Sequence, residues 1–139
     1  MIYYAWAITS DVLALLICTY ALVRGGPAER GGAAVIGIGW ILSIALQTPA
    51  LGLNQGIFLV DVVGLVLLAW ISLRSRKIWT LCCAAFQFNA VAIHVVAYCF
   101  PRIGVVSILT VIGFWGGYGL LAALGGGMIS VERERRRAR

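Results

Sequence analysis

Five polar residues that can bind a proton or form hydrogen bonds lie within the long apolar stretches of this chain. They are two acids, two amides and the only histidine: Asp11, Gln47, Asp61, Gln87 and His94. Ionisable groups inside a membrane are costly, and they usually face a cavity, another helix or a ligand. An imidazole changes its protonation near neutral pH, and a neighbouring carboxylate tunes that change. These residues are therefore the candidate intramembrane polar site.

The composition is that of a membrane protein. Of the 139 residues, 62% are hydrophobic and only 12% are charged, whereas soluble domains average about 25% charged residues. The mean hydropathy is +0.98. No polar segment is long enough for a separate soluble domain. The sequence predicts an all-α integral membrane protein with a single domain over residues 1–130 and a basic cytoplasmic tail over residues 131–139.

Five apolar runs separated by short polar breaks predict a bundle of five transmembrane helices. A helix rises ~1.5 Å per residue, so about 20 residues cross the ~30 Å hydrocarbon core. In lipid, a helix satisfies its own backbone hydrogen bonds. Residues 24–32 are expected to form a loop, and the end of the tail is expected to fray. The five predicted helices cover residues 2–23, 33–53, 57–73, 78–100 and 103–129.

The basic residues predict the orientation of these helices. With five spans, ten of the eleven Lys and Arg residues lie on one side of the membrane, and only Arg102 lies on the other. Short loops rich in Lys and Arg stay in the cytoplasm. The sequence therefore predicts an N-terminus outside, a C-terminus inside, and a multi-pass protein of a bacterial-type cytoplasmic (inner) membrane.

On this topology, several candidate polar residues fall at similar depths. Asp11, Gln47, Asp61 and His94 lie in the outer half of the bilayer, one on each of the first four helices. Gln87 and His94 are seven residues apart and share a helical face. The functional interpretations are a proton or ion relay, a quinone head-group site, or a tetrapyrrole with His94 as axial ligand. The alternative is a polar contact that holds the helices together, worth ~0.6–2 kcal/mol.

Metal binding and catalysis have weaker support. A zinc site needs three or four ligands, which His94, Asp61 and Asp11 supply only if all three converge, so no metal site is predicted. No hydrolase, metalloprotease, phosphate-loop or dinucleotide motif occurs, and no catalytic residue is assigned. The four cysteines include no C-x-x-C pair, and we interpret them as free thiols.

A glycine-rich stretch, GFWGGYG, marks the last predicted helix. Gly113 and Gly117 have the G-x-x-x-G spacing that lets two helices approach closely. Trp115 and Tyr118 lie beside them, away from the usual interfacial belt of aromatic residues. These four residues are a candidate interface with another chain or with a flat cofactor, and packing within the chain is the alternative.

The expected partners are the lipid bilayer, other membrane protein subunits or a second copy, and anionic lipid at the basic tail. Nucleic-acid binding is not expected, because no basic face with base-reading residues is present. The first functional hypothesis is a non-catalytic auxiliary subunit of a respiratory or photosynthetic type of complex that contacts a pigment or quinone. The alternative is a small proton-coupled transporter or exporter that uses Asp11, Asp61 and His94.

Overall fold

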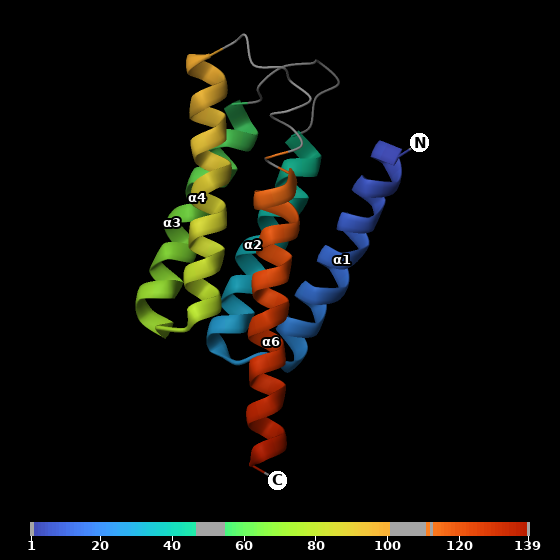
Figure 1. Ribbon diagram of the computed structural model, residues 1–139, viewed down its shortest axis with the longest axis vertical. Helices are drawn as coiled ribbons and strands as arrows, with labels where there is room; N and C mark the ends of the chain where they lie inside the picture. The colour runs from blue at the N-terminus through green and yellow to red at the C-terminus, as the bar shows by residue number, and fades with distance from the viewer. Residues whose placement is uncertain (1, 47–54, 101–110, 112, 139) are drawn as a thin grey trace.

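Long helices run side by side in the computed structural model, which describes residues 2–46, 55–100, 111 and 113–138, with side chains from Ile8 onward. They alternate in direction along the chain (Figure 1). The described part contains no strand. Its elements are α1 (Ile2–Arg24), α2 (Pro27–Leu46), α3 (Gln55–Ser75), α4 (Ile78–Cys99), the π-helix η1 (Gly113–Gly119) and α6 (Leu120–Arg137).

Four helical segments of the described part are long and apolar enough to cross a membrane. They are α2, α3, α4 and the continuous segment formed by η1 and α6. The predicted all-helical class is confirmed, and these four segments suit a membrane protein. A fifth span formed by α1, and the orientation of the termini, remain predictions.

Several predicted boundaries differ from those observed. The expected loop over residues 24–32 shrinks to Gly25 and Gly26, because Pro27 starts α2. Proline suits the first helical position, where its missing N–H has no helical partner to lose. The third helix is longer than predicted by two residues at each end, over Gln55–Ser75. The tail does not fray within the described residues, because α6 continues to Arg137.

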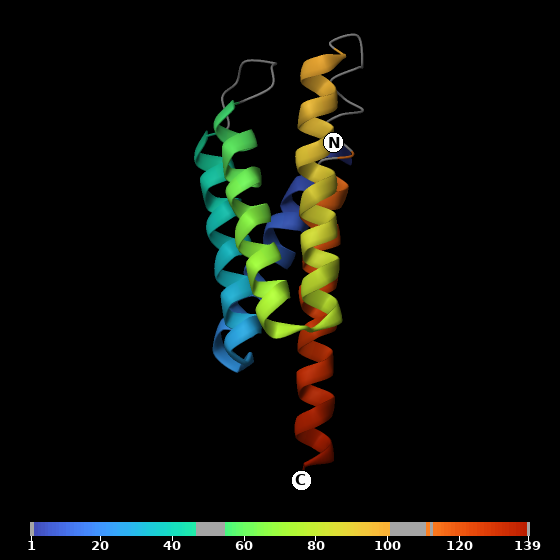
Figure 2. The same cartoon turned by 90° about the vertical axis from the view of Figure 1, so that its left-hand side faces the viewer.

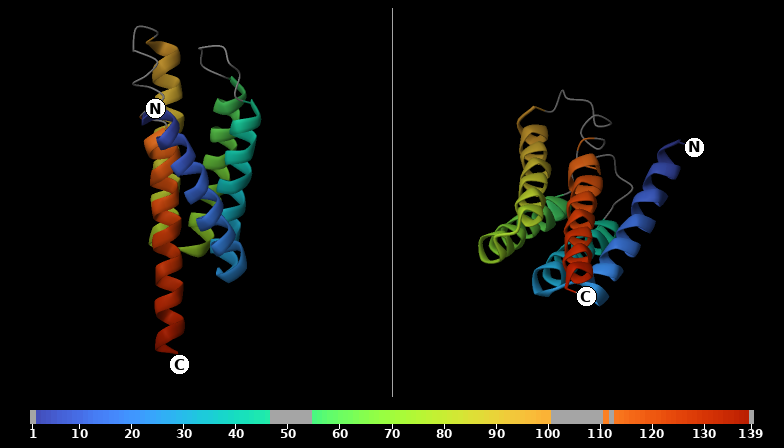
Figure 3. Two further views of the ribbon diagram at one scale, coloured as in Figure 1. Left: turned by 90° about the vertical axis from the view of Figure 1, so that its right-hand side faces the viewer. Right: turned by 60° about the horizontal axis from the view of Figure 1, so that its bottom comes forward.

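Two helical hairpins and a final helix make up the bundle. One hairpin joins α1 to α2, the other joins α3 to α4, and α2 packs against α3 between them. The last helix packs against α4, α1 and α2 (Figures 2 and 3). Both hairpin connections lie at the same end of the bundle, as does the C-terminus (Figure 1). We call this end the turn end.

Small residues let the helices pack closely near the turn end. The ring of Trp79 on α4 fills the space between two glycines. A Cβ at Gly32 of α2 would lie 2.9 Å from the Trp79 ring, and one at Gly127 of α6 would lie 2.7 Å away. Carbon atoms pack at about 3.5–4.0 Å, so neither position accepts a side chain without displacing the indole.

Candidate functional site

Three of the five predicted polar residues meet between α3 and α4. His94 Nε2 lies 3.0 Å from Asp61 Oδ2. The side-chain amide of Gln87 donates to Asp61 Oδ1 at 2.9 Å, and the same nitrogen lies 3.1 Å from the Asp61 backbone carbonyl. Each oxygen of the Asp61 carboxylate therefore has its own partner on α4.

Helical spacing explains why these groups meet. Gln87 and His94 are two turns apart, so both point from α4 towards α3, and both are buried. Gly64 follows Asp61 by three residues on α3, and a Cβ there would lie 3.5 Å from the Gln87 amide nitrogen. That is an ordinary van der Waals distance, so a small residue at position 64 fits beside the amide.

The other nitrogen of His94, Nδ1, is buried and makes no hydrogen bond with any residue that the structure describes. The His94 side chain is only 5% exposed. The ring of Phe58 lies 5.7 Å from the imidazole, and Phe58 in turn contacts Tyr98. The Asp61 side chain is somewhat more open, at 15% exposure. The Phe58 ring thus packs beside the imidazole, and Tyr98 packs against Phe58.

This geometry suits the sharing of a proton. With the imidazole neutral, Nε2–H donates to Asp61 and Nδ1 carries a lone pair. With the imidazole charged, both ring nitrogens carry a proton. Asp61 and His94 together can therefore take up a proton at Nδ1 without losing their mutual hydrogen bond.

Asp11 is not part of this cluster. Its Oδ1 accepts a hydrogen bond from Trp40 Nε1 on α2 at 2.8 Å, and Asp11 is exposed. Gln47 lies outside the described residues. The predicted set therefore separates into Asp61, Gln87 and His94 between α3 and α4, and Asp11 between α1 and α2. Equal depth does not bring residues together when their helices are not neighbours.

The glycine-rich stretch forms η1 and packs within the chain. Gly117 is buried, and a Cβ there would lie 3.4 Å from the Trp40 ring. Trp115 stacks against Phe86 of α4, with ring centroids 5.3 Å apart. Packing within the chain, one of the two interpretations of this stretch, thus accounts for Gly117. A contact of Gly113, Trp115 or Tyr118 with another chain remains a prediction.

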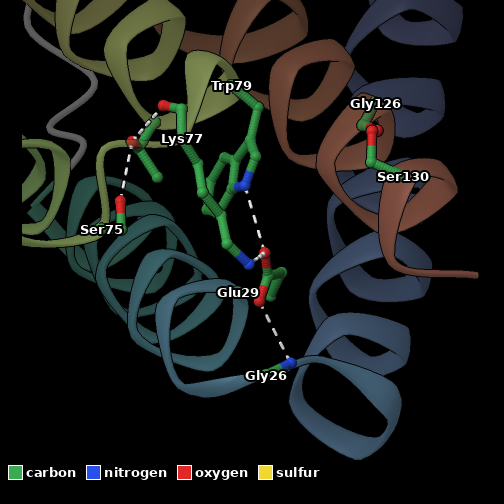
Figure 4. A network of polar contacts seen from close by, with 8 residues as sticks. Gly26, Glu29, Ser75, Lys77, Trp79, Gly126 and Ser130 are labelled. Carbon is green, nitrogen blue, oxygen red and sulfur yellow. Dashed lines mark hydrogen bonds and ion pairs between the residues drawn. The ribbon is translucent and has the colours of Figure 1, made fainter. Parts of the chain in front are cut away.

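A second polar network, which the sequence analysis missed, joins the two hairpins at the turn end (Figure 4). The side chain of Glu29 has no exposed surface. Its Oε1 accepts from Lys77 Nζ at 2.7 Å and from Trp79 Nε1 at 3.2 Å, and its Oε2 accepts from the Gly26 N–H at 3.1 Å. Pro27 followed by an acid in the first turn is a helix-start signal, and it could have placed Glu29 on a helix.

Cysteines and metal donors are dispersed. All four cysteines are free; Cys18 and Cys83 are buried, and Cys99 is exposed. No group of three or more His, Cys, Asp or Glu side chains gathers within the described residues. A zinc site made by His94, Asp61 and Asp11 is therefore not formed there. For an axial ligand, Nδ1 is the nitrogen of His94 left free by Asp61.

Comparisons with protein-family models, with curated proteins and with solved structures give no match to this chain. The fold and the site therefore define only a broad structural class of protein. In its described part, the chain is all-helical, has four segments apolar enough for a membrane, and holds an acid–histidine pair between two of them.

Proposed function

We propose that this is a small multi-pass membrane protein in which the Asp61–His94 pair binds and releases the proton of a proton-coupled transport step. The observation that carries this proposal is the buried Nδ1 of His94, which has no hydrogen-bond partner among the described residues while Nε2 contacts Asp61. An unsatisfied buried polar atom costs about 1–3 kcal/mol. Such atoms are rare in folded proteins, and a proton-binding role is one explanation for keeping one.

The proposed topology places this pair inside the membrane. It has five spans, with α1 as the first, the N-terminus outside and the turn end in the cytoplasm. The basic residues at the turn end support this orientation through the positive-inside rule. Asp61 and His94 then lie in the outer half of a bacterial-type cytoplasmic membrane.

The single histidine makes proton binding directly measurable. Protein labelled with ¹⁵N-histidine and placed in lipid nanodiscs gives only imidazole signals of His94. We expect the neutral ring to carry its proton on Nε2, and acidification to protonate Nδ1 reversibly. Asp61→Asn should change the Nε2 signal, because it removes the charge that contacts the ring. A ring whose signals stay constant from pH 5 to 8.5 would overturn the proposal.

An auxiliary subunit of a larger membrane complex is the second candidate, favoured by Asp11. This acid lies on an exposed part of α1, and an ionisable group that faces lipid is costly unless another protein covers it. Its partner would be another membrane subunit or a second copy of this chain, with a pigment or quinone at the contact.

Purification from native membranes in a mild detergent tests this second candidate. Co-eluting chains are identified by mass spectrometry, and the absorption spectrum shows any pigment. We expect Asp11→Leu to release the partner. Trp40→Phe, which removes the same hydrogen bond but keeps the carboxylate, should retain it. A wild-type protein that elutes alone and colourless would reject the subunit hypothesis.

A further inference from the structure

A groove of about 570 Å³ runs between α1 and α6 towards the turn end. It takes no part in the Asp61–His94 site. Apolar side chains form most of its walls, and they come from both helices. These residues are Leu16, Ile17 and Tyr20 of α1 and Met128 and Ile129 of α6, with Gly125 at its inner end.

Gly125 lines the groove and leaves open space there, because it has no side chain. A Cβ at Gly125 would meet no atom within 4 Å, so the space beside it is open. Leu16 and Ile129 are 61% and 55% exposed. An apolar trough that opens on the outer surface of a membrane bundle faces the acyl chains of lipids.

Arginines surround the other end of the groove. Arg133 and Arg136 line it directly, and Arg24, Arg135 and Arg136 line a smaller pocket beside it. Glu132 is the one acid there, and it lies 3.7 Å from Arg24 and 3.6 Å from Arg135. Within the described residues, Arg133 and Arg136 form no ion pair. The groove therefore ends in an excess of positive charge.

The spacing along α6 matches the depth of one lipid leaflet. Gly125, Ile129, Arg133 and Arg136 follow one another at steps of four, four and three, so they share one face. From Gly125 to Arg133 the helix rises about 12 Å, close to half of the ~30 Å hydrocarbon core. The end of α6 extends beyond the rest of the bundle (Figure 1), and its last turn holds Arg135, Arg136 and Arg137. In the proposed topology these arginines reach the level of lipid headgroups.

We propose that this groove binds an anionic phospholipid. One acyl chain lies along the trough beside Gly125, and the phosphate contacts Arg133 and Arg136. Charge complementarity selects the headgroup, because basic residues near a membrane surface each attract anionic lipid by about 1 kcal/mol. The site is thus more specific than a basic tail on a charged membrane, since it needs an apolar groove and two particular arginines.

The charge requirement is tested by titrating the detergent-purified protein with phosphatidylglycerol and with phosphatidylcholine, and counting bound lipids by native mass spectrometry. We expect selective binding of phosphatidylglycerol. Arg133→Gln/Arg136→Gln should weaken it about 30-fold, from about 1 kcal/mol per arginine. The matched control Arg76→Gln/Arg137→Gln removes the same charge from the turn end, at positions outside the groove, and should retain wild-type affinity.

The shape requirement is tested at two adjacent glycines. A Cβ at Gly125 or at Gly126 has nothing within 4 Å, but only Gly125 lines the groove. Gly125→Leu should abolish selective binding, whereas Gly126→Leu, which alters the same helix by the same side chain, should keep it. Equal binding of the two lipids, or equal binding by the two leucine variants, would overturn the proposal.

Discussion

Glu29→Ala is expected to lower the free energy of unfolding by about 2–4 kcal/mol. Removing one member of a buried ion pair usually costs about 3–5 kcal/mol, and the 43% exposure of the Lys77 side chain reduces that value. The substitution also leaves Trp79 Nε1–H and the Gly26 N–H without their acceptor, and opens space beside the indole. Unfolding in mixed micelles of increasing denaturing detergent measures the change.

Two control variants separate charge from packing at Glu29. Glu29→Gln keeps the volume and an oxygen acceptor but loses the ion pair with Lys77, so its effect should be smaller than that of alanine. Glu132→Ala removes an acid at the same end whose closest cation, 3.6 Å away, is partly exposed. Such pairs contribute about 0–1 kcal/mol. If Glu29→Ala costs no more than Glu132→Ala, the network does not stabilise the turn end.

Asp61→Leu is expected to lower the free energy of unfolding by about 1–3 kcal/mol and, if the proposed function holds, to abolish proton-coupled transport. It removes the interhelical contact and leaves His94 Nε2 buried without a partner. Gln87 retains the backbone carbonyl of residue 61 as an acceptor, which limits the loss. Stability is measured as for Glu29, and transport is measured as pH-gradient-driven uptake into reconstituted vesicles.

The double variant Asp61→Leu/His94→Leu distinguishes a structural contact from a functional one. Replacing both members of a buried polar pair with apolar side chains is often neutral or stabilising. We expect this variant to be more stable than Asp61→Leu but equally inactive. Full activity in the stable double variant would show that the pair only holds the helices together, and would reject the proton-coupling role.

Helical periodicity predicted the part of the site that depends on one helix. Gln87 and His94 share a face because they are seven residues apart, and the structure places both on Asp61. Helical periodicity could not predict which helices are neighbours. Asp11 has a similar predicted depth, but α1 packs against α2 and α6, whereas α3 packs against α2 and α4. Asp11 therefore meets Trp40 instead of Asp61.

The ends of helices were the least predictable elements, because their polar residues resemble loops. Glu29 lies outside the apolar run that starts at Ala33, yet it is helical and buried. Its burial is tolerated because Lys77 balances its charge, and both Lys77 and Trp79 donate hydrogen bonds to its carboxylate. In α6, Arg and Glu are good helix formers, and Glu132 lies near Arg135 one turn further on. Helix propensity and this local ion pair together extend the helix through the polar tail.

The Glu29–Lys77 contact also constrains the order in which the chain can assemble during synthesis. The two residues are 48 positions apart, so the first hairpin is made before Glu29 has its charged partner. Until α3 and the start of α4 have been synthesised, Glu29 must stay hydrated at the membrane surface, because an unpaired carboxylate is costly to bury. Lys77 and Trp79 then donate hydrogen bonds to Glu29 and join the two hairpins. We therefore expect the first hairpin to reach its final packing only after the start of α4 has been synthesised.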